Sequence, residues 1–348
     1  MPHIGPARTD RLVQRFGSLQ AVWNAPKDAL RAVLEPRPLS ELIAARGRVD
    51  PLRELERIIA LGMRVMRPGD GLYPSMLAEI SGRPSVLYVR GDVLPADDAS
   101  IAIVGTRRAT PYGRHSAERI ASELARAGLT VISGLARGVD AVAHRAALAC
   151  GGRTLAVLGS GVDVIYPGEH RQLAEQIVAA GAIISELPPG AKPDAQNFPA
   201  RNRIISGMSL GVVVIEAARR SGALITASFA GDQGREVFVV PGSIFAPSSE
   251  GTNALLRDGA RIVRDGADVL EDLGLSASRV SKARQSELLL DDNERQLYAA
   301  LNEEARHIDE LAEEAGLAAG QAGALLLTME LKGLVRNHGA QFYVRHLE

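Results

Sequence analysis

Short apolar runs that alternate with helical segments constrain the fold of this chain more than any other feature. The runs are short and mainly apolar, as expected of strands that helices cover on both faces. Strands that alternate with helices predict the α/β class, with a doubly wound, mostly parallel sheet. An earlier run, "SVLYVRGDV", is interpreted as an edge strand. The main runs are "SIAIVG", "LTVISG", "TLAVLGSG", "AIISE", "LGVVVIEA", "EVFVVPG" and "ARIV".

The regions on either side of this pattern differ from it. Residues 1–62 read as short helices, similar to SAM-like or helix-hairpin-helix modules, and both a protein-contact role and a DNA-contact role remain open. Residues 63–275 form the predicted α/β domain, and the polar stretch 276–286 is the predicted linker. Residues 287–348 read as three helices followed by a small hairpin, which is the winged-helix pattern.

Composition narrows the class of protein. The 348 residues carry a formal net charge of −1, which neither indicates nor excludes a nucleic-acid partner. The single cysteine, Cys150, excludes an internal disulfide and suits a reducing compartment. The first residues lack a secretory pattern and no apolar run is long enough to span a bilayer. We therefore expect a cytoplasmic protein without a membrane partner.

Glycine or a small polar residue stands at nearly every predicted strand end. Ligands of doubly wound sheets bind beyond these ends, and glycine lets backbone amides approach an anion. The pattern predicts a phosphate-rich ligand. No P-loop and no complete G-x-G-x-x-G is present, and the G-x-S-x-G at residues 207–211 precedes a strand rather than following one. The strand ends in question are Gly105-Thr106, Ser133-Gly134, Gly159-Ser160-Gly161, Ser221-Gly222 and Pro241-Gly242-Ser243.

Arginines extend this prediction from a small ligand to a polyanion. Arginine binds phosphate oxygens bidentately, and a mononucleotide needs one or two such partners. A larger set around one edge indicates a nucleic-acid backbone. The alternative is that these arginines are solvated or form internal ion pairs, with Asp140 or Glu216 as a partner. The set comprises Arg107, Arg108, Arg137, Arg201, Arg203, Arg219 and Arg220.

Phe198 is the candidate aromatic platform. It stands between Asn197 and Pro199, in what reads as a loop just ahead of Arg201. Proteins that bind single strands pair a basic groove with aromatic side chains on which bases stack. The alternative for Phe198 is a core position under the loop.

The motifs together resemble the DNA-processing protein A family (DprA, also called Smf) over about residues 65–270. The resemblance implies an extended Rossmann fold and a protein that binds single-stranded DNA without catalysis. It implies protection of incoming transforming DNA, loading of the RecA recombinase, and a homodimer formed through the Rossmann domain. The matching strings are "IVGTRRATPYG", "SGLARGVDAVAH", "LGSGVDVIYP", "FPARNRIISG", "VVVIEAARRSGALITA", "VFVVPG" and "GTNALLRDGA".

The candidate DNA-binding residues follow from the family resemblance together with the pattern of glycines and arginines. Two departures from the family stand out. Only Lys192 supplies a positive charge shortly before "FP", and the presumed recognition helix "AAGQAGALLLTMELKGL" has one lysine and no arginine. The winged helix is therefore interpreted as a protein-contact or regulatory module. The candidate DNA-binding residues are Gly105, Arg107, Arg108, Ser133, Gly134, Arg137, Gly138, Gly159, Ser160, Gly161, Lys192, Asn197, Phe198, Arg201, Asn202 and Arg203.

An alternative function is that of a nucleotide phosphoribohydrolase of the lysine-decarboxylase-like Rossmann family. Its P-G-G-x-G-T-x-x-E pattern is incomplete in "VPGSIFAPSSEGTNALL", and no carboxylate stands at the position of the acid. No paired carboxylates, metal-ligand cluster or activated nucleophile can be assembled from the motifs. We therefore expect no catalysis, no cofactor and no metal.

Overall fold

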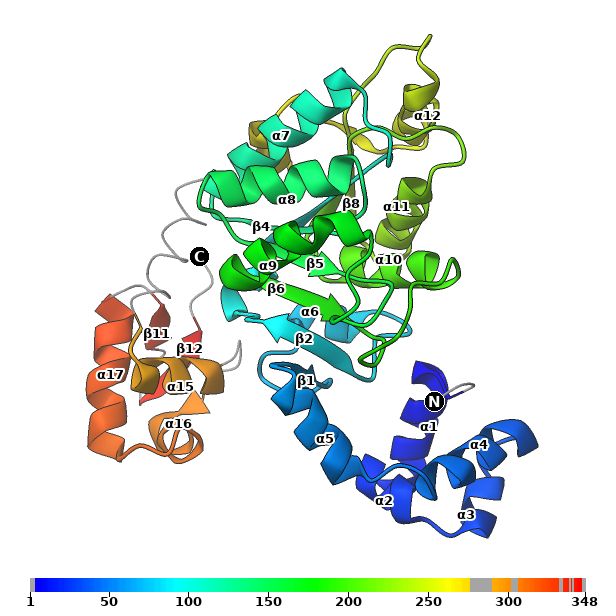
Figure 1. Ribbon diagram of the computed structural model, residues 1–348. Coiled ribbons are helices and arrows are strands. Elements are labelled where there is room, and N and C mark those ends of the chain that lie inside the picture. The colour runs from blue at the N-terminus through cyan, green and yellow to red at the C-terminus, as the bar shows by residue number, and fades with distance from the viewer. Residues whose placement is uncertain are drawn as a thin grey trace. The chain divides into compact units, whose positions relative to one another are not determined.

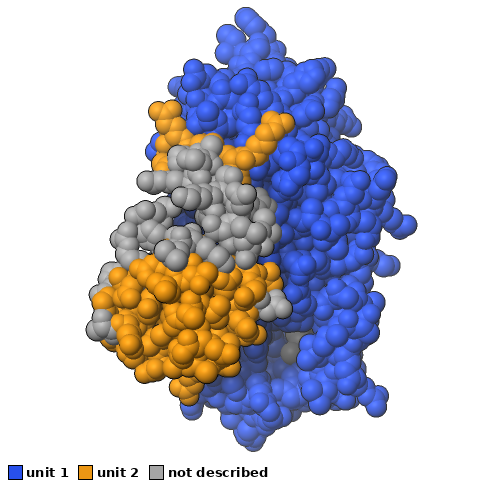
Figure 2. Space-filling model, turned by 90° about the vertical axis from the view of Figure 1, so that its left-hand side faces the viewer, with its two compact units in different colours: residues 1–125, 129–269 blue, residues 126–128, 270–348 orange. Residues whose placement is uncertain are grey.

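The computed structural model describes residues 4–275, 290–301, 306–331, 334–337, 339 and 341–345. The chain divides into two compact units, one of residues 1–125 and 129–269 and the other of residues 126–128 and 270–348 (Figure 2). The predicted linker at residues 276–286 lies outside the described residues. The domain limits at residues 62 and 275 stay a prediction.

Residues 6–60 form short helices, as the sequence predicts. Ser18 caps α2 by accepting a hydrogen bond from the Ala21 amide, and Asp50 caps α5 in the same way. Leu12, Leu30 and Leu42 are buried in an apolar cluster of this region. The helices are α1 (Pro6–Phe16), α2 (Leu19–Asn24), α3 (Lys27–Arg31), α4 (Pro36–Arg46) and α5 (Pro51–Ala60).

A nine-stranded sheet follows, in the order β1-β2-β6-β5-β4-β3-β7-β8-β9 (Figure 1). Strands β3 to β9 pair in parallel, which confirms the predicted α/β class. The run predicted as an edge strand is β2, but it pairs on both sides, because the short β1 lies outside it. The strands are β1 (Arg64–Met66), β2 (Leu87–Gly91), β3 (Ser100–Val104), β4 (Thr130–Ser133), β5 (Thr154–Val157), β6 (Ala182–Ser185), β7 (Gly211–Val214), β8 (Glu236–Val239) and β9 (Arg261–Ile262).

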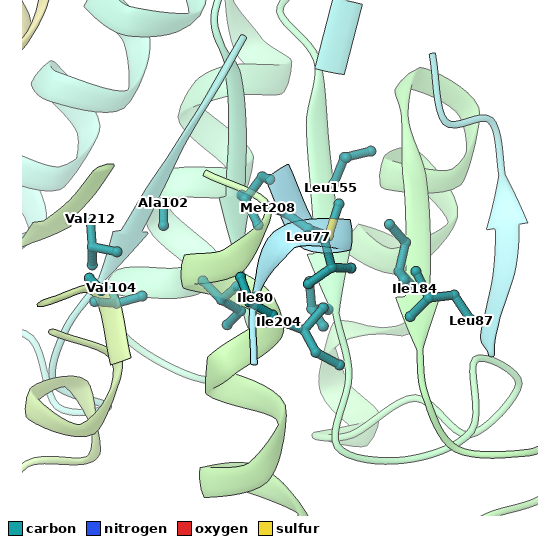
Figure 3. Packing of buried hydrophobic residues seen from close by; sticks show 14 of the residues in the cluster. Leu77, Ile80, Leu87, Ala102, Val104, Leu155, Ile184, Ile204, Met208 and Val212 are labelled. Carbon is teal, nitrogen blue, oxygen red and sulfur yellow. The ribbon is translucent and has the colours of Figure 1, made fainter. Parts of the chain in front are cut away.

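Helices cover both faces of the sheet. One core cluster joins the sheet to α6, α10 and α11, and Figure 3 shows Leu77, Ile80 and Ile204 converging on it. A second cluster joins the sheet to α8 and α9. The helices of this region are α6 (Ser75–Glu79), α7 (Pro111–Arg126), α8 (Val139–Ala149), α9 (Arg171–Ala180), α10 (Asn197–Gly207), α11 (Gly222–Asp232), α12 (Glu250–Arg257) and α13 (Gly266–Asp272), with 3₁₀ turns at Pro95–Asp98, Gly168–His170 and Pro247–Ser249.

The direction of strand addition reverses between β3 and β7. From β3 the chain adds β4, β5 and β6 on one side, and it then returns to place β7 on the other side of β3. The loops that follow β3 and β7 therefore diverge and leave a crevice at the carboxyl end of the sheet. Doubly wound proteins bind their ligands at this point.

The second unit has the predicted winged-helix elements, three helices and a hairpin. An additional two-residue strand, β10, pairs with β12 and completes a three-stranded sheet. Leu297, Leu311 and Leu326 form the centre of its own apolar core. The elements are α15 (Asp292–Ala300), β10 (Arg306–His307), α16 (Ile308–Glu314), α17 (Ala319–Leu331), β11 (Val335–Asn337) and β12 (Phe342–Arg345).

Candidate nucleic-acid interface

A cavity of about 630 Å³ lies where the strand order reverses. We call it the switch-point cavity. Its walls come from the end of β3, the loop after β4, the first two turns of α10 and the first turns of α11. Its lining includes Val104, Gly105, Arg107, Ala136, Asp140, Tyr166, Phe198, Arg201, Asn202, Ile205, Ser221, Gly222 and Ile225.

Helix α10 presents one face to this cavity. Phe198, Arg201, Asn202 and Ile205 all line it, and their spacing of three, four and seven residues is that of one helical face. The prediction that Phe198 lies in a loop is wrong, because α10 begins at Asn197. Pro199 is compatible with this helix because the first turn needs no intrahelical donor at that position.

An arginine lies over an aromatic ring at the cavity wall. The Arg107 guanidinium carbon is 5.4 Å from the centroid of the Phe198 ring, within the range of a cation–π contact. The Phe198 ring is half-buried, and the Tyr166 ring lies 5.7 Å from it, centroid to centroid. Tyr166 is 43% exposed, so the pair offers an accessible aromatic surface. Sequence analysis missed Tyr166, although an aromatic residue directly after the glycine-rich "LGSGVDVI" is a usable signal.

The loop between β4 and α8 already holds an anion, the carboxylate of Asp140. The Gly134 and Ala136 amides donate to Asp140 Oδ2 at 3.1 and 3.3 Å. Asp140 is 7% exposed, and burial raises the pKa of its carboxyl, against the opposing effect of Arg201. The expectation that these loop amides face an external phosphate is therefore wrong for Gly134, because its amide already has an internal acceptor.

Arg201 is a structural residue in the floor of the cavity. Its guanidinium donates to the carbonyl oxygens of Gly134, at 2.9 Å, and Val157, and it is 7% exposed. Burial lowers the pKa of this guanidinium to about 10. A Cβ atom at Gly134 would overlap the Arg201 guanidinium. The glycine is therefore needed for the approach of an internal arginine.

Other predicted site residues support the loops rather than face the cavity. The Ser133 hydroxyl donates to the Ile103 carbonyl, and the Ser160 hydroxyl donates to the Val164 carbonyl. Both serines are buried, as are Gly159 and Gly161. Gly159 gives room to the Phe198 ring, since a Cβ atom there would lie 2.9 Å from Phe198 Cδ1.

Arg203 faces away from the switch-point cavity. Its Nη2 donates to both carboxylate oxygens of Glu186, each at 2.8 Å, and Arg203 lines a different cavity together with Gln233 and Arg235. Arg201 and Arg203 differ by two positions, so they cannot share one helical face. The structure therefore does not bring Arg203 together with Arg107 and Phe198.

The remaining predicted residues lie around the cavity. Lys192 is exposed and Asn197 is half-buried, and neither lines the cavity. The Asn202 side chain lines it and donates to the Gly222 carbonyl at 3.2 Å. Arg108, Arg137 and Gly138 line a neighbouring groove. Arg219 and Arg220 are exposed just before α11.

Sequence features that could belong to an esterase, a metalloprotein or a membrane protein do not form the corresponding sites in the described residues. Ser209, at the centre of the G-x-S-x-G string, is fully buried and donates to the Ile205 carbonyl. Among the described residues, no group of three His, Cys, Asp or Glu side chains is placed to hold a metal ion. None of the helices in the described part of the chain has both the length and the apolar character that crossing a membrane requires.

Comparison with known proteins identifies the family whose sequences and domains this chain resembles. Residues 64–274 match the family model for DNA recombination-mediator protein A, and residues 281–341 match the model for the DprA winged helix domain. A Synechocystis protein named Smf is 34% identical, over 98% of this chain and 96% of that protein.

Solved structures agree with the family models. The crystal structure of DNA processing protein A from Streptococcus pneumoniae superposes with a TM-score of 0.68 at 33% identity, over 76% of this chain and 92% of that one. A Helicobacter pylori DNA processing protein A, described in a study of its single-stranded DNA binding mode, superposes with a TM-score of 0.55 at 30% identity, over 61% of this chain and 95% of that one. With both domain models matched along its length, this chain belongs to the DNA-processing protein A (DprA/Smf) family.

Proposed function

We propose that the switch-point cavity binds single-stranded DNA with little sequence preference. The observation that carries the proposal is the Arg107 guanidinium stacked on Phe198, at the cavity wall. Arg107 is exposed, and no carboxylate of the described residues lies within ion-pair distance of it. Its charge is therefore available to a phosphate, while Phe198 and Tyr166 offer a surface to a base.

The lining favours a nucleic acid over a small phosphorylated metabolite. Ile205 and Ile225 add apolar surface beside the charged and aromatic wall, and Asn202 supplies a side-chain amide. Few side chains of the lining could read base edges by hydrogen bonding, so the expected recognition is stacking plus phosphate contact. The Helicobacter pylori relative, whose structure was described for its single-stranded DNA binding, supports this assignment.

Fluorescence anisotropy with labelled single-stranded and duplex DNA at two salt concentrations tests the proposal. Arg107→Ala should weaken binding of the single strand and lower the slope of log affinity against log salt by about 0.7, because one phosphate partner is lost. Phe198→Ala should cost about 1–3 kcal/mol of binding free energy through lost stacking, with a smaller change of the salt slope.

The matched control is Arg257→Ala, which removes an exposed arginine of α12 that lines neither the switch-point cavity nor the neighbouring groove. It should bind like the parent. Equal affinity of the parent for duplex and single strand, or unchanged affinity of Arg107→Ala, would contradict the proposal.

We propose further that binding is not followed by chemistry. Asp140 is the sole carboxylate among the described residues that line the cavity, and it is buried under two amide donors and beside Arg201. A general acid or base must reach the reacting group, and Asp140 Oδ2 instead accepts from two amides of the loop. Incubation of the pure protein with adenosine monophosphate, ATP and DNA should yield no product. Release of adenine, abolished by Asp140→Asn, would instead support the phosphoribohydrolase alternative.

The cellular role that we propose is protection of incoming transforming DNA and loading of the RecA recombinase, by a homodimer in the cytoplasm. The description of the matching family as a recombination mediator supports it. Addition of the protein should accelerate RecA assembly on single-stranded DNA that is already coated by a single-strand binding protein. Light scattering of the protein alone should give twice the mass of one chain, as expected of a homodimer. A monomer that leaves RecA assembly unchanged would contradict this role.

A further inference from the structure

A second hollow of about 370 Å³ lies between the first turns of α7 and α8. Arginine side chains dominate it, and we call it the arginine groove. Two of them, Arg114 of α7 and Arg145 of α8, were not singled out by any sequence motif. Its lining includes Arg107, Arg108, Ala109, Arg114, Arg137, Gly138, Ala141, Val142, Arg145, Glu169 and His170.

The arginine groove adjoins the switch-point cavity. Arg107 lines both. Between them lies a small depression of about 30 Å³ whose walls include Arg107, Arg137, Tyr166 and Phe198. A DNA strand that leaves the cavity past the Arg107–Phe198 pair would therefore meet the arginine groove next.

The charge of the groove is strongly positive. Five arginines face one carboxylate, Glu169, which forms a bidentate pair with Arg137 at 2.7 and 2.8 Å. Arg108, Arg114 and Arg145 are exposed, and within the described ranges no carboxylate lies within ion-pair distance of them. Arg114 does donate to the Ala109 carbonyl at 2.6 Å, which holds its guanidinium over the loop after β3. The amino-terminal turns of α7 and α8 add the positive ends of two helix dipoles.

The chemistry of the groove differs from that of the cavity. The cavity combines aromatic, apolar and cationic side chains, whereas the described lining of the groove contains no Phe, Tyr or Trp. Guanidinium groups without an aromatic surface fit phosphates rather than bases. We propose that the arginine groove binds the sugar-phosphate backbone of the DNA strand whose neighbouring nucleotides occupy the switch-point cavity. This inference rests on the proposed function and assigns the path of the strand.

Oligonucleotide length separates the two parts of the site. An oligonucleotide of about four to six nucleotides can be held by the cavity alone, whereas one of about twenty nucleotides can also reach the groove. The double variant Arg114→Ala/Arg145→Ala should bind the short oligonucleotide like the parent. For the long one it should lose about tenfold in affinity, and the salt slope should fall by about 1.4, because two phosphate partners are removed.

Two control variants test whether the loss of affinity comes from the charge of the groove arginines. Arg145→Lys retains the charge and should bind the long oligonucleotide within about twofold of the parent. Arg257→Ala should leave both lengths unaffected. All variants should melt like the parent, since the substituted side chains are exposed. If the double variant binds the long oligonucleotide like the parent, or loses affinity for both lengths equally, the groove does not hold the strand. If the parent binds neither length, the proposed function itself fails.

Discussion

Glu169 is the one carboxylate among the described residues of the arginine groove, and it holds Arg137. Both side chains are more than half exposed, so their pairing contributes little to folding. The hydrogen bonds from Arg137 lower the pKa of Glu169, so it stays ionised at neutral pH. A DNA phosphate must therefore compete with a charged internal partner for Arg137.

Glu169→Gln should remove that competition. We expect tighter binding of single-stranded DNA and a salt slope that is steeper by about 0.7, because Arg137 becomes one more phosphate partner. The control is Glu175→Gln, which breaks a similar bidentate pair with Arg90 at a position that lines neither the cavity nor the groove. Weaker binding by Glu169→Gln in anisotropy titrations would show that Glu169 positions Arg137 for DNA rather than competing for it.

His144 makes folding stability depend on pH. It is fully buried in α8, with Nδ1 2.6 Å from Thr154 Oγ1, whose hydroxyl donates to the Val131 carbonyl. The ring therefore carries a proton on Nδ1 and donates it to Thr154 Oγ1. Burial lowers its pKa from 6.5 to about 3, and the charges of His170, Arg201 and Arg145 act in the same direction.

The sign of the effect follows from proton binding. Between pH 6.5 and about 3 the unfolded chain binds a proton at His144 that the native chain excludes, so acid favours unfolding in that window. From about pH 7.5 to about pH 5.5, His144 should lower the free energy of unfolding by about 1.4 kcal/mol. Urea titrations at both pH values should show this loss in the parent and a correspondingly smaller loss in His144→Leu. An identical loss in both proteins would show that His144 does not titrate as its burial requires.

At the level of single residues, sequence can identify arginines but not their surroundings. Arg107 and Arg201 are both predicted as DNA contacts. The structure leaves Arg107 exposed and directs Arg201 inward, to the carbonyl oxygens of Gly134 and Val157. These carbonyls come from loops and strands that are distant in sequence from Arg201, so no local pattern reveals the contact.

At the scale of elements, one helix determines which residues meet. Once α10 begins at Asn197, the spacing of Phe198, Arg201 and Asn202 places them on the cavity side, while Arg203 pairs with Glu186 on another side. The string "NFPARNR" is interpreted as a loop from its sequence because Asn and Pro usually mark one. If the string is instead taken as a helix, its periodicity alone separates Arg201 from Arg203.

The junction between the loop after β3 and the start of α8 depends on Gly138. This residue has φ +76° and ψ −128°, a conformation that L side chains avoid, and a Cβ atom there would overlap the Thr106 carbonyl oxygen. Gly138→Ala should therefore cost about 1–3 kcal/mol of stability and displace Arg107, which weakens DNA binding as well. Thermal melting and anisotropy measure the two effects.

The control for that substitution is Gly231→Ala in α11, where a Cβ atom meets nothing within 4 Å. Alanine has a higher helix propensity than glycine, so this variant should be as stable as the parent or more stable by up to about 1 kcal/mol. A Gly138→Ala protein that melts like Gly231→Ala would show that the junction can relax without strain.

At the scale of the whole molecule, the order of apolar runs is enough to predict the parallel sheet and its helical layers. It is not enough to place β1, because a strand of three residues, Arg64–Met66, leaves no periodic signal. The position of the cavity can be predicted as the carboxyl edge of the sheet. The contact between Tyr166 and Phe198 in its wall cannot be predicted, since the two residues come from different parts of the sequence and meet only in the folded chain.

The two units should contribute unequally to DNA binding. The described helix α17, at residues 319–331, contains no lysine or arginine, carries Glu330, and buries Leu326 and Met329 in the core of its own unit. A helix of this composition is a poor partner for phosphates or bases. The arginines of the cavity and the groove all lie in the first unit.

A chain that ends at Leu275 should therefore keep single-stranded DNA binding within about twofold of the full chain, with the same salt slope, because the number of phosphate partners is unchanged. Arg107→Ala in the shortened chain should lower affinity as much as it does in the full one. Circular dichroism checks that the shortened chain keeps its fold, which has apolar clusters of its own. A tenfold loss of affinity together with a shallower salt slope would place phosphate contacts in the winged helix, and would contradict its interpretation as a protein-contact module.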